Sequence, residues 1–456
     1  MKKNNTPTEN ILGTGSIGKL IATFAIPSVI AMLVNALYNI VDQIFIGHRV
    51  GYLGNGAANV VLLTTLVTLA LSLLIGDGAA SFFSLHLGAG KKEAARNGVL
   101  NALFLIVVLS LVTLVFCLIF LEPILRLFGA TDVILPYALD YGFIIVLGLP
   151  FIMISTSINA LIRADGSPKY AMLSMILGAV INGCLDPVFI FVLGLGIKGA
   201  AISTFIGQFI SFALSIAYLK RFKSVTLSRR AFSFQFKTAK QICGLGISSF
   251  IDQIAFTMVM VVNNNLIIHY GATSPYGSEI LLTAYGLSMK VQEILFTLLL
   301  GIAIGMQPIV GYNYGAKNYG RVKKAYSLSL VIGTLISIAA TVIFVFFPDP
   351  IIHLFGSQDN ALYLEFSKKF FQTYFILYIF FGFQTITGVF FQAIGKPAQT
   401  AAISLSYQLV FKILSALLLT TIIGLDGVLW SGPFADALTF ILSLVLIVIQ
   451  MRKIGK

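Results

Sequence analysis

Twelve long apolar stretches dominate the sequence and restrict it to one class of fold. Each holds about 20 or more mostly apolar residues, the length that a helix needs to cross a bilayer. They cover approximately residues 18–46, 57–87, 98–121, 133–157, 168–193, 199–219, 240–267, 280–308, 322–347, 366–390, 398–423 and 427–450. Strands of membrane barrels are shorter and alternate in polarity. Because backbone groups in lipid must bond to one another, the sequence predicts an all-α polytopic membrane protein with twelve transmembrane helices.

Composition excludes the main soluble alternatives. Apolar residues make up 58% of the 456 residues and charged residues only 10%, whereas soluble domains are roughly 25% charged. A soluble fold of this size could not keep so much apolar surface from water. A soluble enzyme, a disordered chain and a nucleic-acid-binding module are therefore excluded. Cys117, Cys184 and Cys243 fall in or beside apolar runs, which is neither a disulfide framework nor a metal-ligand cluster.

The distribution of positive charge predicts an orientation. With the N-terminus inside, the inner segments hold 23 of the 30 lysines and arginines, the outer ends hold five, and Lys290 and Lys412 lie within spans. This bias places both termini in the cytoplasm. It also accounts for the net charge of +13 without a nucleic-acid partner. The polar N-terminus leads into a stretch too long for a signal peptide, so we expect no cleaved signal.

An internal repeat divides the chain into two halves. Five motifs recur in order at offsets of 221 to 229 residues. Ile46-Gly47-His48 matches Ile267-Ile268-His269, and Leu87-Gly88-Ala89 matches Tyr314-Gly315-Ala316; the group Pro123, Leu127-Phe128-Gly129 and Asp132 matches the group Pro350, Leu354-Phe355-Gly356 and Asp359. Gly166 and Pro168 match Gly395 and Pro397; Gly199 and Ser203 match Gly427 and Ser431. Each half has six spans and hence the same orientation, so a pseudo-two-fold axis along the membrane normal should relate them. We expect six-helix lobes at 1–219 and 240–456, joined by a basic cytoplasmic linker at 220–239.

Such a duplicated architecture is typical of transporters that work by alternating access; a scaffold that no longer moves is the alternative. Two glycine-rich segments, Gly13-Thr-Gly15-Ser-Ile-Gly18 and Gly194-Leu-Gly196-Ile-Lys-Gly199, have the spacing of dinucleotide sites, but no strand precedes either. The four histidines form no ligand or catalytic cluster. We therefore expect no cofactor and no ATP site, and an ion gradient as the energy source.

Polar residues within spans are costly in lipid and are the first candidates for function. One group comprises Asp42 in the first span, Asn182 and Asp186 one turn apart in the fifth, and Thr204 in the sixth. At 1.5 Å per residue, all lie roughly 7–11 Å below the outer boundary. Their oxygens could bind a metal cation such as Na⁺, or a proton. A hydrogen-bonded clamp between helices is the structural alternative.

The repeat makes this first group asymmetric. Asp42 maps to Asn263, Asn182 to Phe411 and Asp186 to Ser415, so the second half lacks the acidic pair. Asymmetry within a symmetric scaffold favours a role in coupling over one in packing.

A second group lies near mid-depth in the second half: Asp252, Lys290, Glu293, Lys412 and Asp436. Lys290 and Glu293 are three residues apart and can pair. Three acids and two lysines leave one formal negative charge, which suits a binding surface for organic cations or a proton relay. Mutually paired charges that orient helices are the alternative.

Three further residues within spans stand apart from these groups. Asp77 and Asp140 are more isolated, and the sequence assigns them no role. Pro27 lies in the middle of the first span and predicts a bend there.

These features resemble the multidrug and toxic compound extrusion (MATE) family, near its MepA-like bacterial branch. The resemblance runs from about Ile17 to Met451, and rests on the duplicated layout and on Ile26-Pro27-Ser28, Val41-Asp42-Gln43-Ile44-Phe45-Ile46-Gly47, Leu87-Gly88-Ala89-Gly90-Lys91, Arg163-Ala164-Asp165-Gly166-Ser167-Pro168 and Asn182-Gly183-Cys184-Leu185-Asp186-Pro187. It implies Na⁺- or H⁺-coupled export of amphipathic, often cationic drugs. The family's first-lobe cation site matches Asp42, Asn182, Asp186 and Thr204. Some members also carry an acid in the tenth span, which the predicted stretch 366–390 lacks.

Other functions remain as alternatives. A flippase for lipid-linked precursors, from the related superfamily, should have a strongly cationic cavity, whereas the spans here hold only Lys290 and Lys412. A membrane enzyme should show a nucleophile and base or a metal cluster, and a channel a repeated filter segment. The sequence shows neither. We expect a monomer whose partners are small-molecule drugs or organic cations, H⁺ or Na⁺, and the lipid bilayer.

Overall fold

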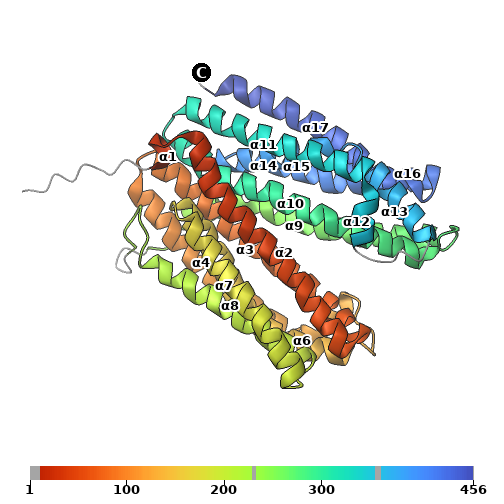
Figure 1. Ribbon diagram of the computed structural model, residues 1–456. Helices are drawn as coiled ribbons and strands as arrows, with labels where there is room; N and C mark the ends of the chain where they lie inside the picture. Colours follow the sequence, from red (N-terminus) through yellow and green to blue (C-terminus); the bar gives the residue numbers. More distant parts are fainter. Residues whose placement is uncertain (1–10, 228–232, 355–360, 455–456) are drawn as a thin grey trace, which may run out of the picture.

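Long helices make up most of the described chain. A computed structural model describes residues 11–227, 233–354 and 361–454, and these contain no strand (Figure 1). The helices are α1 (Ile11–Thr14), α2 (Ile17–Val50), α3 (Tyr52–Gly88), α4 (Lys92–Ile119), α5 (Leu121–Leu127), α6 (Leu135–Ala164), α7 (Pro168–Pro187), η1 (Val188–Val192), α8 (Ile197–Leu219), α9 (Phe236–Gly271), α10 (Gly277–Gly315), α11 (Tyr319–Phe346), α12 (Pro348–Leu354), α13 (Ala361–Tyr374), η3 (Tyr378–Phe380), α14 (Phe381–Ala393), α15 (Pro397–Leu405), η4 (Ser406–Ile413), α16 (Leu414–Ile423) and α17 (Asp426–Lys453).

The predicted spans agree with these helices. Within the described residues, 11 helices are long and apolar enough to cross a membrane, and α13 and α14, bent by 50°, add a twelfth if they form one span. This span begins at Ala361, earlier than predicted, and so includes Glu365. The Glu365 side chain is exposed, and its carboxylate accepts a 2.8 Å hydrogen bond from the Tyr276 hydroxyl. The all-α fold class is confirmed.

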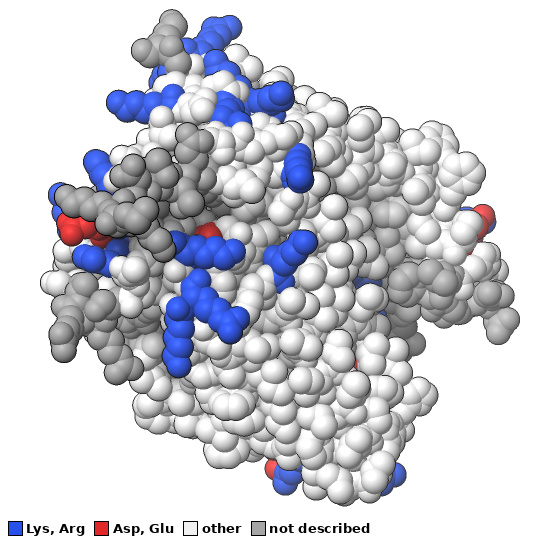
Figure 2. Space-filling view, turned by 60° about the vertical axis from the view of Figure 1, so that its left-hand side comes forward, with Lys and Arg blue, Asp and Glu red and all other residues white. Residues whose placement is uncertain are grey.

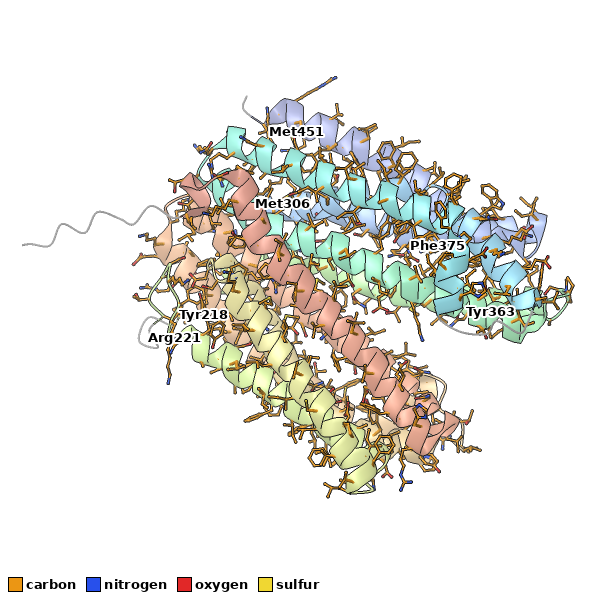
Figure 3. All side chains as sticks on the ribbon, viewed as in Figure 1. Tyr218, Arg221, Met306, Tyr363, Phe375 and Met451 are labelled. Atoms are coloured by element: carbon orange, nitrogen blue, oxygen red, sulfur yellow. The ribbon has the colours of Figure 1, made fainter. Side chains whose placement is uncertain are left out.

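Two helical bundles form the molecule, one from α2 to α8 and the other from α9 to α17. They converge at the end that carries α1 and the chain's C-terminus, and diverge toward the other end (Figure 1). Lysines and arginines gather on the convergent end (Figure 2). Tyr218 and Arg221 mark this end and Tyr363 the opposite one (Figure 3). The convergent end is therefore the side predicted to be cytoplasmic. Five of the basic residues counted in that prediction lie outside the described residues: Lys2, Lys3, Arg229, Arg230 and Lys456.

At the convergent end, α2 and α9 each pack on the opposite lobe. Leu20 and Phe24 of α2 share a buried cluster with Met306 of α10 (Figure 3). Ile242 of α9 shares one with Ile158 of α6. Because each lobe completes the core of the other, this end is closed by apolar packing.

A symmetric glycine contact brings the lobes together there. A Cβ on Gly88 would lie 1.9 Å from the Tyr312 carbonyl oxygen, and one on Gly315 would lie 2.1 Å from the Leu85 carbonyl oxygen. Both pairs are related by the repeat offset of 227 residues. Only glycine allows two helices to approach so closely. The repeat partners Phe355, Gly356 and Asp359 lie outside the described residues.

The segment between the bundles is anchored to the first one. The Asp165 carboxylate accepts hydrogen bonds from the backbone N–H groups of Lys223 at 2.8 Å and Ser224 at 2.9 Å. Burial raises the pKa of the Asp165 carboxyl, although these hydrogen bonds oppose the shift. The Asn101 amide bonds to backbone groups of residues 233 and 235. Helix α8 ends at Leu219, as predicted, but α9 begins at Phe236, four residues before the predicted start of the second lobe. The domain boundaries themselves stay a prediction.

The first glycine-rich segment runs from the end of α1 through a turn into the first residues of α2, and the second lobe holds it. The Arg321 guanidinium donates to the carbonyl oxygens of Gly15 at 2.6 Å and Leu12 at 3.1 Å. The Asn313 amide also donates to the Leu12 carbonyl at 2.9 Å. These bonds satisfy carbonyl groups that a short helix leaves unpaired, and tie the start of the chain to α10 and α11.

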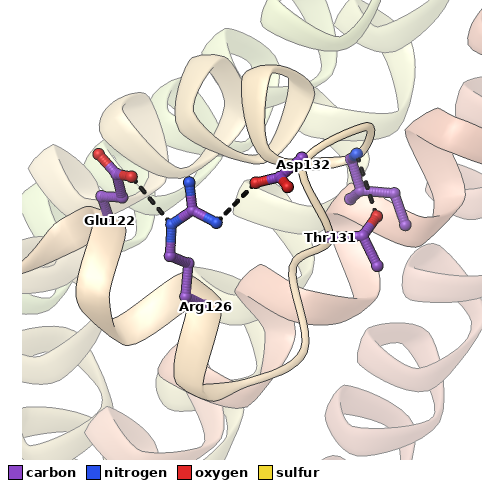
Figure 4. A network of polar contacts seen from close by, with 5 residues as sticks. Glu122, Arg126, Thr131 and Asp132 are labelled. Carbon is purple, nitrogen blue, oxygen red and sulfur yellow. Dashed lines mark hydrogen bonds and ion pairs between the residues drawn. The ribbon is translucent and has the colours of Figure 1, made fainter.

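An exposed charge network closes α5 at the opposite end. The Arg126 guanidinium donates to Glu122 at 2.9 Å and to Asp132 at 2.8 Å (Figure 4). These hydrogen bonds, to Asp132 above all, raise the pKa of Arg126. Asp132 belongs to the repeated motif around Leu127, and Arg126 immediately precedes Leu127, so this part of the motif stabilises the connection between α5 and α6.

Candidate functional site

The first polar group converges from three helices. Asp42 lies on α2, Asn182 and Asp186 on α7, and Thr204 on α8. Their exposed fractions are 8%, 2%, 0% and 8%. The spacing of four residues places Asn182 and Asp186 on one face of α7.

Hydrogen bonds fix the orientation of these side chains. The Asn182 amide donates to the Thr204 hydroxyl oxygen at 3.1 Å. The Ser203 hydroxyl donates to Asp186. The carboxyl groups of Asp42 and Asp186 face one another within hydrogen-bonding reach. Thr204 thus orients the amide, whose carbonyl oxygen is left free.

Three oxygens of this site lack a donor. No N–H or hydroxyl group of the described residues donates to Asp42 Oδ1, Asn182 Oδ1 or Asp186 Oδ2, although all three are buried. Buried acceptors without a partner are unfavourable, and two facing carboxylates repel one another unless they share a proton or a cation. The arrangement is chemically suited to hold either one.

Three further residues belong to this site and were not predicted from the sequence. Tyr38 and Tyr141 lie close enough to interact with both carboxyl groups, and the Tyr141 hydroxyl also bonds to Thr204. Ser203 was noted only as part of the repeat. Two patterns pointed to them: Tyr38 precedes Asp42 by one helical turn, and Ser203 is adjacent to Thr204.

The structure separates the second polar group into three places. Asp252 on α9 forms side-chain hydrogen bonds with Ser404 and Gln408. Lys290 and Glu293 are both exposed on α10; they attract one another, but no direct ion pair joins them. Lys412 and Asp436 are buried within the second lobe.

Asp77 and Asp140 both have partners. The Ser249 hydroxyl donates to Asp77 at 2.8 Å, which links α3 to α9. Lys198 lies 3.2 Å from Asp140 in an exposed ion pair on α6 and α8. Asp77 therefore belongs to the contact between lobes and Asp140 to the surface. Pro27 lies inside the continuous helix α2, so the predicted bend does not interrupt that helix.

Known families provide an independent comparison. A family model described as MatE matches residues 27–188 and 249–418, one segment in each lobe. The chain belongs to the MatE family. Its first segment begins at Pro27 and includes Asp42, Asn182 and Asp186; its second includes Lys290, Glu293 and Lys412.

MatE relatives align along nearly the whole chain. The multidrug export protein MepA of Staphylococcus haemolyticus (strain JCSC1435) is 27% identical over 447 residues, covering 95% of this chain and 93% of its own. An FAD transporter of Shewanella oneidensis is 25% identical over 435 residues, covering 92% of each chain.

Solved structures show the same fold. An outward-facing multidrug resistance MATE family transporter of the MOP superfamily superposes with a TM-score of 0.90 at 24% identity, covering 97% of this chain and 98% of its own. A MOP superfamily transporter from Pyrococcus furiosus gives 0.90 at 24% identity and 98% coverage of each chain. The chain is thus a multi-pass membrane protein of a multidrug efflux transporter family, which is a family of transporters and not of enzymes.

Proposed function

We propose that this chain is an antiporter that exports amphipathic, often cationic compounds in exchange for H⁺ or Na⁺. Its coupling site comprises Asp42, Asn182, Asp186 and Thr204. Both termini lie in the cytoplasm, and export crosses the plasma membrane of a bacterium. The chain acts as a monomer.

One observation carries the proposal: the three buried oxygens of Asp42, Asn182 and Asp186 that lack a donor. A structural clamp would be expected to satisfy its own hydrogen bonds. Here Thr204 and Ser203 satisfy one atom each of Asn182 and Asp186. The atoms left over are all acceptors, and acceptors need a proton or a cation.

Binding at this site would change its charge. Two carboxylates without a cation repel one another in a medium of low dielectric, and uptake of H⁺ or Na⁺ removes that repulsion. If the repulsion is relieved differently in the two states of the lobes, the ion gradient favours one state over the other. This is how the site couples to alternating access.

Substrate recognition is assigned to the second lobe. Glu293 is exposed on α10, near the middle of its span, and its carboxylate attracts cationic compounds while Lys290 partly offsets it. Asp252 serves as a relay or binding group of the same lobe. A flippase is disfavoured because Lys412 is buried beside Asp436 rather than presented to a cavity.

Ethidium efflux tests the proposal as a whole. Cells that express the chain are loaded with dye, de-energised, and given a Na⁺ gradient or a pH gradient separately. We expect one of the two gradients to accelerate efflux relative to cells with an empty vector. Efflux that neither gradient changes, or efflux that needs ATP, would contradict it.

A further inference from the structure

A buried lysine occupies the polar centre of the second lobe. Lys412 is only 3% exposed. Its ammonium lies 5.6 Å from the centre of the Tyr374 ring and 5.3 Å from that of Tyr407. Asp436, 1% exposed, interacts with Lys412 through charge, yet no described carboxylate lies within ion-pair contact of the ammonium. The side chain is a cation enclosed by aromatic faces and one acid.

The position of Lys412 matches that of Asn182 in the first lobe. Asn182 is the buried residue one turn before buried Asp186, and Lys412 is the buried residue one turn before buried Ser415. Phe411, the partner of Asn182 in the sequence repeat, is only half-buried. The π-helix η4 (Ser406–Ile413) explains the change, since its wider turns shift the phase of the side chains. The corresponding part of α7 is a regular α-helix.

Two repeat partners of the first-lobe site, Asn263 and Gly432, lie against tyrosines that surround Lys412. Asn263, the partner of Asp42, donates to the Tyr285 hydroxyl at 3.3 Å, and Tyr285 interacts with Lys412. Gly432 is the partner of Thr204 at an offset of 228 residues. A Cβ on Gly432 would lie 2.7 Å from the Tyr374 ring, so this ring takes the space of a larger side chain.

We infer that the Lys412 ammonium is a built-in cation that fills the second-lobe counterpart of the cation site, with Asp436 as its counter-charge. The inference rests on the proposed role of the first-lobe site. The second lobe then neither takes up nor releases a coupling ion, because its cation is covalently part of the chain. Lys412 is a positioning residue in this account, and the first lobe alone carries coupling.

Without the Lys412 ammonium, Asp436 should bind a cation from solution. In Lys412→Met, Asp436 stays buried with a hydrogen bond from the Gln384 amide at 3.1 Å and one from the Tyr407 hydroxyl, but without a positive charge. The other titratable groups around it are the phenols of Tyr374 and Tyr378. A buried carboxylate left without its partner is strongly destabilising. Uptake of H⁺ or Na⁺ by Asp436 would relieve this.

Thermal unfolding of the purified full chain in detergent tests the inference. All variants carry Asp42→Asn and Asp186→Asn, which silence the first-lobe site. Melting is measured at pH 8 in choline chloride, at pH 8 in NaCl, and at pH 5.5 in choline chloride. The parent gives the reference melting temperature in each of the three media. Lys412→Met should melt about 5–10 °C lower at pH 8 in choline, and should regain most of this in Na⁺ or in acid.

The double change Lys412→Met with Asp436→Asn is the matched control. It removes both charges, so in each medium it should melt near the parent temperature, without the response to Na⁺ and pH that is specific to Lys412→Met. A Lys412→Met chain that responds to neither would overturn the inference. If Lys412→Met does not fold at pH 8 in choline, folding of the double variant supports the inference and its failure to fold overturns it. These outcomes are separate from efflux, which tests the first-lobe site.

Discussion

The hydroxyl of Ser249 donates a 2.8 Å hydrogen bond to the carboxylate of Asp77, and the two residues belong to different lobes. The Gln392 amide donates to the Ser249 hydroxyl oxygen at 2.9 Å, and the positive charge of Arg163 also attracts Asp77. Next to Asp77, a Cβ on Gly78 would lie 2.1 Å from the Ile242 carbonyl oxygen of α9, so the network flanks a close contact between the lobes. It therefore holds the lobes together on the side predicted to be cytoplasmic.

Ser249→Ala should loosen this closure. A hydrogen bond to a charged group is worth about 1.5–3 kcal/mol, so opening should become roughly tenfold more frequent or more. With Cys117→Ser and Cys184→Ser, half-buried Cys243 on α9 reports on the opening through its rate of maleimide labelling. Ser248→Ala is the matched control, because the Ser248 hydroxyl is buried without a partner among the described residues. Equal labelling rates in the two variants would contradict the account.

Two glycines on α9 should respond in opposite ways to alanine. A Cβ on Gly246 would lie 1.8 Å from the Leu74 carbonyl oxygen of the other lobe, whereas one on Gly244 would meet nothing within 4 Å. Gly246→Ala should lower thermal stability by the equivalent of about 1–3 kcal/mol, since the backbones must separate. Gly244→Ala should be neutral or stabilising by about 0.5–1 kcal/mol. The comparison uses melting of the purified proteins, and similar melting temperatures would refute the close contact.

The predicted topology can be tested by labelling from outside. In a cysteine-free chain, a cysteine at position 230 should stay unlabelled by an impermeant maleimide in intact cells, because the positive-inside bias places this segment in the cytoplasm. A cysteine at Leu127, which is 81% exposed at the opposite end, should react. Labelling at position 230 in intact cells would show that the predicted orientation is wrong.

Glu293→Gln should change substrate choice more than coupling. Loss of the carboxylate leaves the nearby Lys290 less compensated, so cationic substrates should suffer more than neutral ones. The measurement is the ratio of resistance to a monovalent cationic dye and to a neutral or zwitterionic drug. Adding Lys290→Met should restore part of the resistance to the dye. Equal loss for both compounds without rescue would assign Glu293 to coupling or folding.

The fold could be predicted almost fully from the sequence, because apolar length alone specifies spans in lipid. The rise per residue also predicts a common depth for Asp42, Asn182 and Asp186, and this depth stays a prediction. Depth does not give direction, however. It grouped Lys290 and Glu293 with Lys412, although the first two are exposed on α10 and Lys412 is buried in the second lobe.

Contacts between lobes were beyond the sequence for a different reason. Asp77 and Ser249 are 172 residues apart in the chain, yet they share a hydrogen bond. No local sequence pattern encodes such a pairing. The π-helix η4 likewise shifts Lys412 into the place that the repeat assigned to Phe411. A change from α-helix to π-helix leaves no signal in the spacing of the motifs, so the repeat alone pairs Asn182 with half-buried Phe411.

The proposed exchange depends on the role of Asp42 and Asp186 in binding the coupling cation. Its most direct test is gradient-driven transport in proteoliposomes with equal amounts of folded wild type, Asp42→Asn, Asp186→Asn and Asp140→Asn. Asp140→Asn is the control, because that acid lies in an exposed ion pair 3.2 Å from Lys198. We predict that Asp42→Asn and Asp186→Asn each reduce driven transport to the level of empty vesicles, while Asp140→Asn transports at the wild-type rate. Driven transport at the wild-type rate in either Asp42→Asn or Asp186→Asn would contradict this role.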